Sequence, residues 1–176
     1  MHLIACIEDP QLIRTIPGLS PNIARRRRNF TRGLAHVGTY KAWLSDADTD
    51  ARDRFEHDGP RYRADGFQIA ADLADLTDGS LTTTNNISDF GTRLILGVGW
   101  TGTKADGTKA DVNSGSGHCD SWTSTEAKVL TGDITSSANE WTSWLGRPCS
   151  QSTFYLHCLS DFDPDQVFED GFEAID

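Results

Sequence analysis

The sequence lacks any long apolar run: no stretch approaches the roughly 20 consecutive apolar residues that a helix needs to span a bilayer. We therefore expect no transmembrane segment. The first residues, MHLIACIEDPQLIRTIPGL, also lack the charged-then-apolar order of a secretory signal peptide, so no export signal is visible in the chain. Hydrophobic residues make up only 37% of the 176 residues, which predicts a limited core built on large side chains, here five Trp and eight Phe.

Positive charge is scarce after the first 32 residues. Residues 1–32 carry six Arg against Glu8 and Asp9, a charge of +4, whereas residues 33–160 carry 10 basic and 17 acidic groups, a charge of −7. Phosphate contacts supply most non-specific affinity for nucleic acid, and the four clustered arginines Arg25–Arg28 suit them. The remainder is acidic and no aromatic residues are interleaved with the arginines, so we expect no nucleic-acid partner.

Composition divides the chain into three regions. Residues 1–32 are a poorly specified basic segment in which three prolines interrupt any long element. Residues 33–160 are expected to form the folded domain, and residues 161–176, with seven acids and no base, an acidic C-terminal tail. A chain of this length has room for one domain of ordinary size with modest extensions.

Short elements joined by long polar loops are predicted within the domain. In GTYKAWLSD (38–46), Tyr40, Ala42 and Leu44 occupy alternate positions, which predicts a short strand. The most apolar stretch, TRLILGVGWTGT (92–103), predicts another strand. Further ordered segments are expected at 119–128, 139–145 and 154–159. A domain with this layout normally needs disulfide bonds for stability.

Four cysteines, at positions 6, 119, 149 and 158, allow three disulfide pairings, and the spacing does not choose among them. Close CxxC pairs and histidines at zinc-finger spacing are absent, so we expect no structural metal. Disulfides are the favoured explanation, and four buried free thiols in a cytosolic protein are the alternative. A bridge between Cys119 and Cys149 would close a loop of about 30 residues and contribute on the order of 3 to 4 kcal/mol.

Three segments together resemble one protein family. GLAHVGTYKAWLSD (33–46) resembles the GLAGT-aromatic-basic-Ala-aromatic-Leu-Ser segment of collagen-derived endostatin and of the endostatin-like domains of leptospiral surface proteins. GWTGTKADGTKADVNSGSGHCDSWTS (99–124) is similar to that family's Trp-x-Gly strand, DG turn and Cys-x-x-Trp. SWLGRPCSQSTFYLHCLSD (143–161) is similar to its closing segment. The resemblance implies an α+β fold of the C-type-lectin-like, endostatin-like class.

The same resemblance implies a nested disulfide pattern. Carried over, Cys119 would pair with Cys149, and Cys158 would pair with a cysteine in a helix just before the GLA segment. SPNIARRRRNFTR stands where that helix is expected, and Cys6 is the remaining thiol. One hypothesis is that the native start lies upstream, or that a reading-frame change altered residues 1–32. Either event would also explain the missing signal peptide.

The acidic and histidine-containing segments do not predict a metal or catalytic site. DADTD (46–50) and DFDPD (161–165) place carboxylates at every second position, as in the first half of an EF-hand loop, but lack its Gly at position six and its Glu at position twelve. The sugar-binding triplets of calcium-dependent lectins are also absent. His118 and His157 have no nucleophile elbow around them. We expect no metal and no cofactor.

Exposed aromatics and the long loop from Thr103 to His118 are the predicted binding features. Trp122 lies in the family-like Cys-x-x-Trp and is expected in the core. Trp141 and Trp144, three residues apart near the polar SSANE loop, are expected at the surface, where Trp anchors interfaces well. The candidate binding residues are Trp141, Trp144, Lys104, Asp106 and Lys109.

The sequence favours a non-catalytic binding module, extracellular or at the cell surface, that recognises a protein or glycan partner. The leptospiral resemblance implies host matrix or complement-regulator binding as one option. Two alternatives stay open: a secreted hydrolase that uses His118 or His157 with a nearby carboxylate, and a truncated gene product without independent function. The tail resembles the Phe-x-Asp-Gly-Phe-Glu ending of exported proteins of gram-negative bacteria. Its Phe168 and Phe172 suit either a recognition signal or a disordered solvating segment.

Overall fold

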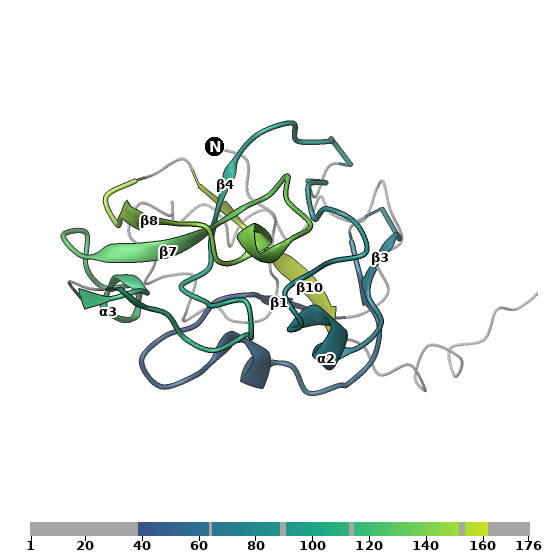
Figure 1. The fold of residues 1–176 in the computed structure, drawn as a ribbon, viewed down its shortest axis with the longest axis horizontal. Helices are drawn as coiled ribbons and strands as arrows, with labels where there is room; N and C mark the ends of the chain where they lie inside the picture. The colour runs from purple at the N-terminus through teal and green to yellow at the C-terminus, as the bar shows by residue number, and fades with distance from the viewer. Residues whose placement is uncertain (1–38, 64, 89–90, 113–114, 152–153, 162–176) are drawn as a thin grey trace, which may run out of the picture.

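The computed structural model describes residues 39–63, 65–88, 91–112, 115–151 and 154–161. The predictions about residues 1–32 and about Phe168 and Phe172 fall outside these ranges and stay predictions. The described chain combines several small sheets with a few single helical turns, which is a mixed α+β architecture (Figure 1). Within these ranges, no helix is both long enough and apolar enough to cross a membrane.

The largest sheet among the described residues has four strands in the order β8-β7-β4-β9. It contains β4 (Val98–Trp100), β7 (Lys128–Asp133), β8 (Leu145–Pro148) and β9 (Tyr155–Leu156). Strand β7 runs antiparallel to both β4 and β8, whereas β9 lies parallel to β4. Strands β8 and β9 are therefore the two edges of this sheet.

A second sheet joins the first and last strands of the described chain. Strand β1 (Thr39–Ala42) pairs antiparallel with β10 (Cys158–Asp161). Figure 1 shows this pair running through the middle of the molecule, with β7, β8 and α3 (Cys119–Trp122) on one side and β3 (Gln68–Ala70) and α2 (Leu73–Leu76) on the other. The β1–β10 pair therefore separates two halves of the domain.

The remaining elements are too short to be stable without tertiary packing, because helix formation needs a costly nucleus and isolated hairpins are marginal in water. The α2 turn begins at Asp72, whose side chain accepts the Asp75 N–H at 2.8 Å and so satisfies a backbone donor. Strand β2 (Arg61–Tyr62) pairs with β3, and β5 (Asp111–Val112) pairs with β6 (Gly115–Ser116). The other short elements are the 3₁₀ turns η3 (Ala51–Arg54) and η4 (Asn139–Trp141).

Two hydrophobic clusters form the core, and alternate residues from β1 onward enter them. Ala42 and Leu44 lie in the first cluster and Trp43 in the second, so the predicted alternation is confirmed, although both faces are buried. The first core contains Ala42, Leu44, Trp100, Cys119, Trp122, Val129, Cys149, Leu156 and Cys158. The second core contains Trp43, Ala51, Phe55, Ile69, Ala70, Leu76, Leu81, Trp141 and Leu159.

The long strand predicted over 92–103 is wrong in its first half. Strand β4 begins only at Val98, and the side chains of Ile95 and Leu96 are 83% and 73% exposed. The Leu94 N–H donates to the Asn86 carbonyl at 2.8 Å, so the preceding residues close a local hairpin instead of extending the sheet. Apolar composition identified the segment but not where it turns.

A buried ion network lies beside the second core. The Asp161 carboxylate at the end of β10 lies 2.7 Å from Lys41 Nζ and 3.8 Å from Arg61 Nη1, and it accepts the backbone N–H groups of Glu56 and His57 at 3.1 and 3.2 Å. The Arg61 side chain is fully buried. Burial alone would raise the pKa of Asp161, but the hydrogen bonds from Lys41 and the two amides hold it below its usual value.

Candidate functional site

The five tryptophans divide sharply by exposure. Trp43, Trp122 and Trp141 are 0% exposed and Trp100 is 1% exposed, whereas Trp144 is 37% exposed. The prediction that Trp122 belongs to the core is confirmed. The prediction of two surface tryptophans is correct for Trp144 and wrong for Trp141.

Trp141 is held inside by the position of η4 against β7. A Cβ on Gly132 would lie 2.0 Å from the Trp141 carbonyl oxygen, so only glycine allows this close approach. The Trp141 ring packs on Trp43, with centroids 5.3 Å apart, and meets His157 edge-on at 5.7 Å. The chain then leaves η4 and enters the edge strand, so Trp141 and Trp144 do not share a face.

Trp144 lies directly before strand β8 and forms an exposed surface with its first residues. We define the β8 surface as Trp144, Leu145, Gly146 and Arg147. Leu145 is 42% exposed, and a Cβ built on Gly146 would have no described atom within 4 Å apart from those of its two chain neighbours. The Arg147 guanidinium carbon lies 5.8 Å from the centroid of the Trp144 ring, a cation–π arrangement. An aromatic, an aliphatic and a cationic group therefore stand together at an open sheet edge.

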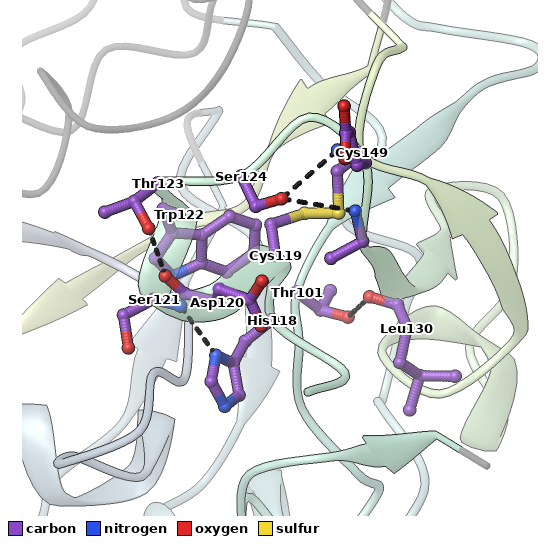
Figure 2. Close-up of a disulfide and its surroundings, with 12 residues drawn as sticks. Thr101, His118, Cys119, Asp120, Ser121, Trp122, Thr123, Ser124, Leu130 and Cys149 are labelled. Carbon is purple, nitrogen blue, oxygen red and sulfur yellow. Dashed lines mark hydrogen bonds between the residues drawn. A yellow bond between two sulfur atoms is a disulfide. The ribbon is translucent and has the colours of Figure 1, made fainter. Parts of the chain in front are cut away.

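The β8 surface is anchored to the first core. The Trp144 N–H donates to the Thr131 carbonyl at 2.7 Å, and the Thr131 hydroxyl donates to the Leu145 carbonyl at 2.7 Å. Directly after β8, Cys149 forms a disulfide with Cys119 (Figure 2). This is the inner pair that the family resemblance implies. The surface is thus fixed at both ends, which limits the entropy that binding would cost.

The predicted outer disulfide is tested only in part. Cys158 in β10 is disulfide-bonded, whereas Cys6 lies outside the described residues. Among the described cysteines none is a free thiol. The alternative of four free thiols is therefore wrong.

The inner disulfide carries a left-handed turn, α3. Cys119, Asp120, Ser121 and Trp122 have φ angles of 55°, 50°, 54° and 66°, and none of them is glycine. Left-handed helical backbone costs L-residues roughly 1–2 kcal/mol each, so tertiary contacts must hold it. His118 Nδ1 accepts the Ser121 N–H at 2.9 Å, as Figure 2 shows, and Trp122 Nε1 donates to a buried backbone carbonyl at 3.0 Å.

Of the predicted loop residues Lys104, Asp106 and Lys109, it is Lys109 that joins its loop to another one. Lys109 donates its N–H to the Asp50 carboxylate at 2.8 Å and its ammonium to the Ala47 carbonyl at 2.7 Å. Hydrogen bonds from Thr108 lower the pKa of Asp106. Lys104 Nζ lies 4.0 Å from a carboxylate oxygen of the exposed Asp111. Lys109 and Asp106 are thus engaged inside the protein, and a binding role for the three residues stays a prediction.

The carboxylates of the DADTD segment also make contacts within the protein. One Asp46 oxygen accepts the N–H groups of Asp48 and Thr49, both at 2.9 Å, and the other pairs with Arg54. In the part of the chain that the structure describes, no group of three His, Cys, Asp or Glu residues could hold a metal ion. These carboxylates shape an acidic loop. Of the DFDPD segment, only Asp161 is described.

The two histidines of the hydrolase alternative lie in different environments. His157 is buried against Trp141, and a Cβ on Gly99 would meet its ring at 2.3 Å. Burial lowers the pKa of His157 to about 4, against an opposing effect of Asp133. His118 instead accepts a backbone N–H from α3, while the Ser121 hydroxyl accepts the Ala47 N–H at 3.1 Å. The two histidines thus lie in different surroundings, and the hydrolase alternative stays a prediction.

No protein-family model matches the chain, and no curated protein matches it. Sequence reasoning found Trp144 but missed Leu145, Gly146 and Arg147. Pro148 was the available signal, because proline within a sheet is confined to edge strands, strand starts and bulges. The β8 surface is the arrangement of described residues that best suits recognition.

Proposed function

We propose that the chain is a non-catalytic binding module of the endostatin-like, C-type-lectin-like class, which acts outside the cell or at its surface and recognises a protein or glycan partner. The observation that carries this proposal is the exposed Trp144, with Leu145 and Arg147 beside it, on an anchored edge strand. The other four tryptophans are buried. Large aromatic and arginine side chains dominate the binding energy of interfaces.

The disulfides support a location outside the cytosol. Cys119 pairs with Cys149, and Cys158 is also disulfide-bonded. Disulfides persist in oxidising compartments and are rare in the cytosol, where thiols are kept reduced. The inner pairing also agrees with the nested pattern of the endostatin-like family, which supports the finer fold assignment.

The proposal is tested by binding of the oxidised full chain to a glycan array and to immobilised laminin, fibronectin and collagen. We expect at least one ligand to bind, and Trp144→Ala to weaken that binding by about tenfold or more, the usual size of a hot-spot effect. Phe67→Ala is the matched control, because Phe67 is also an exposed aromatic, at 60%, but lies at the β2–β3 turn. Equal binding by the two variants, or no binding by the wild type, would contradict the proposal.

A further inference from the structure

Arg147 is a cation without a carboxylate partner among the described residues. Its Nε is buried and has no hydrogen-bond partner in the part of the chain that the structure describes. A guanidinium that is partly removed from water and unpaired gains from an incoming anion. By contrast, four other arginines each have a carboxylate oxygen within 4.0 Å: Arg52, Arg54, Arg61 and Arg63.

The position of Arg147 favours a planar anion next to an apolar group. Its guanidinium lies over the Trp144 ring, and the exposed Leu145 is two positions away on the same strand. The two terminal NH2 groups of a guanidinium can donate two parallel hydrogen bonds, which match a carboxylate. The Trp144 and Leu145 side chains offer contact to an apolar side chain beside that carboxylate.

The backbone of Gly146 points away from the sheet. Lys128 pairs with Pro148, and the Cys149 N–H donates to the Ala127 carbonyl at 3.0 Å, so Lys128–Pro148 is a non-hydrogen-bonded pair. Pairs alternate along an antiparallel ladder, so the pair two positions away, Leu130–Gly146, is of the same type. The Gly146 N–H and C=O therefore face outward and can pair with one residue of an extended chain.

We propose that the β8 surface binds an extended peptide segment of a partner protein in which a carboxylate side chain stands next to an aromatic or aliphatic side chain. The carboxylate pairs with Arg147, the apolar side chain contacts Trp144 and Leu145, and the peptide backbone pairs with Gly146. This inference rests on the proposed binding function and chooses protein over glycan. A second copy of β8 is a poor occupant, because WLGRP contains no carboxylate.

The test uses fluorescent peptides in which Asp-Phe, Asp-Leu, Asn-Phe or Lys-Phe stands in a Gly-Ser background, with dissociation constants from fluorescence anisotropy. We expect Asp-Phe and Asp-Leu to bind the oxidised full chain at least tenfold more tightly than Asn-Phe, and Lys-Phe to bind most weakly. High salt should reduce this preference, because it screens the exposed side of the ion pair. Equal binding of Asp-Phe and Asn-Phe would overturn the proposal.

Variants of Arg147 test the contribution of its charge to peptide binding. Arg147→Ala should remove the preference for Asp over Asn, and Arg147→Lys should restore it only in part, because lysine lacks the planar fork. Lys128→Ala is the matched control: Lys128 is an exposed cation on the neighbouring strand, but it pairs with Pro148 and so projects from the opposite face to Arg147. It should bind like the wild type.

Gly146 offers a second matched pair. Gly146→Pro removes the outward N–H, whereas Gly146→Ala keeps it and adds a methyl group into open space. We expect the affinity for the Asp-Phe peptide to fall at least tenfold for Gly146→Pro alone. Circular dichroism should confirm that both variants fold. Equal affinities of the two folded variants would overturn the backbone contact.

The outcomes also distinguish this inference from the proposed function. If no peptide binds but a glycan or folded protein binds in a Trp144-dependent manner, the peptide inference is overturned and the binding function stands. If Trp144→Ala changes binding to no ligand of either kind, both are overturned. A synthetic peptide of residues 162–176 is included. If it binds more tightly than every Asp-Phe and Asp-Leu probe, the occupant is this chain's own tail and the partner proposal is overturned.

Discussion

The two cores of this domain are secured by different chemistry. The first core contains the Cys119–Cys149 disulfide, which holds a left-handed turn and anchors β8. The second core has no disulfide among its described residues and is bordered by the buried Asp161 ion network and by the buried His157. The first core therefore depends on the redox state of the chain, whereas the second core depends on the protonation of a few buried groups.

The largest effect is expected from removal of the covalent constraint on the first core. In the double variant Cys119→Ala and Cys149→Ala, the free energy of unfolding should fall by about 3 to 4 kcal/mol, because the bridge closes a loop with a sequence separation of 30. Urea unfolding measures this change. A loss below about 1 kcal/mol would show that packing alone holds the first core.

Hydrogen exchange in the same variant measures whether the two cores open separately. The Thr123 and Ser124 amides, which both donate to the Cys119 carbonyl at 3.0 Å, should exchange faster. The Trp43 amide of the second core, which donates to the His157 carbonyl at 2.9 Å, should keep its protection relative to global unfolding. Equal acceleration of all three amides would mean that the two cores unfold as one unit.

The ion network beside the second core should give the next largest effect. Asp161→Asn leaves Lys41 and the fully buried Arg61 without their shared carboxylate, so the free energy of unfolding should fall by about 3 kcal/mol. Glu56→Gln is the matched control: Glu56 also pairs with Lys41, at 2.8 Å, but its side chain is 77% exposed. Its effect should stay within about 0.5 kcal/mol, as for other surface pairs. Similar losses of stability in the two variants would mean that the buried Asp161 pair contributes no more than the exposed Glu56 pair.

His157 makes the second core sensitive to mild acid. The unfolded histidine takes up a proton near its ordinary pKa of 6.5, whereas the folded side chain does so only near a pKa of about 4. The unfolded state therefore binds more protons in this window, and stability present above pH 6.5 is lost as the pH falls towards 4. The expected loss between pH 7 and pH 5 is about 2 kcal/mol.

Urea unfolding at both pH values checks this expectation against a variant that cannot titrate. His157→Gln should be less stable at pH 7, since it disturbs a packed site, but its stability should change much less between pH 7 and pH 5. If the variant kept the full pH dependence of the wild type, another group would be responsible.

The smallest effect concerns the left-handed turn in the first core. Asp120 is exposed and has a φ of 50°, so Asp120→Gly should raise the free energy of unfolding by about 1 kcal/mol, because glycine adopts this conformation without steric cost. Asp120→Ala is the control and should give no such gain. Thermal unfolding compares the two, and equal melting temperatures would mean that the turn is not strained at this residue.

Local pattern predicted part of this arrangement. The alternation of Ala42 and Leu44 with Trp43 was readable because strand side chains point to opposite sides. The inner cysteine pair and the buried Trp122 followed from the family resemblance. The left-handed α3 turn was not readable, since Cys-Asp-Ser-Trp contains no glycine and is held by contacts with distant residues.

The candidate site was predicted only in outline. The sequence placed two tryptophans three residues apart next to a polar loop, and nothing local distinguished them. The close approach of η4 to Gly132 buried one of them, while the edge position of β8 left the other exposed. Arg147 became a candidate only when its position over the Trp144 ring and the absence of a carboxylate partner among the described residues were known.

Composition already predicts that this chain builds its core from a few large aromatic side chains and that its loop-rich layout needs covalent support, because it limits how much apolar surface can be buried. Packing between distant segments set which tryptophan stays at the surface and which carboxylates make contacts within the protein, and it placed Arg147 over Trp144 without a carboxylate partner among the described residues. Exposure and ion pairing depend on contacts between residues far apart in the chain, such as Lys41 with Asp161, and no local pattern encodes them.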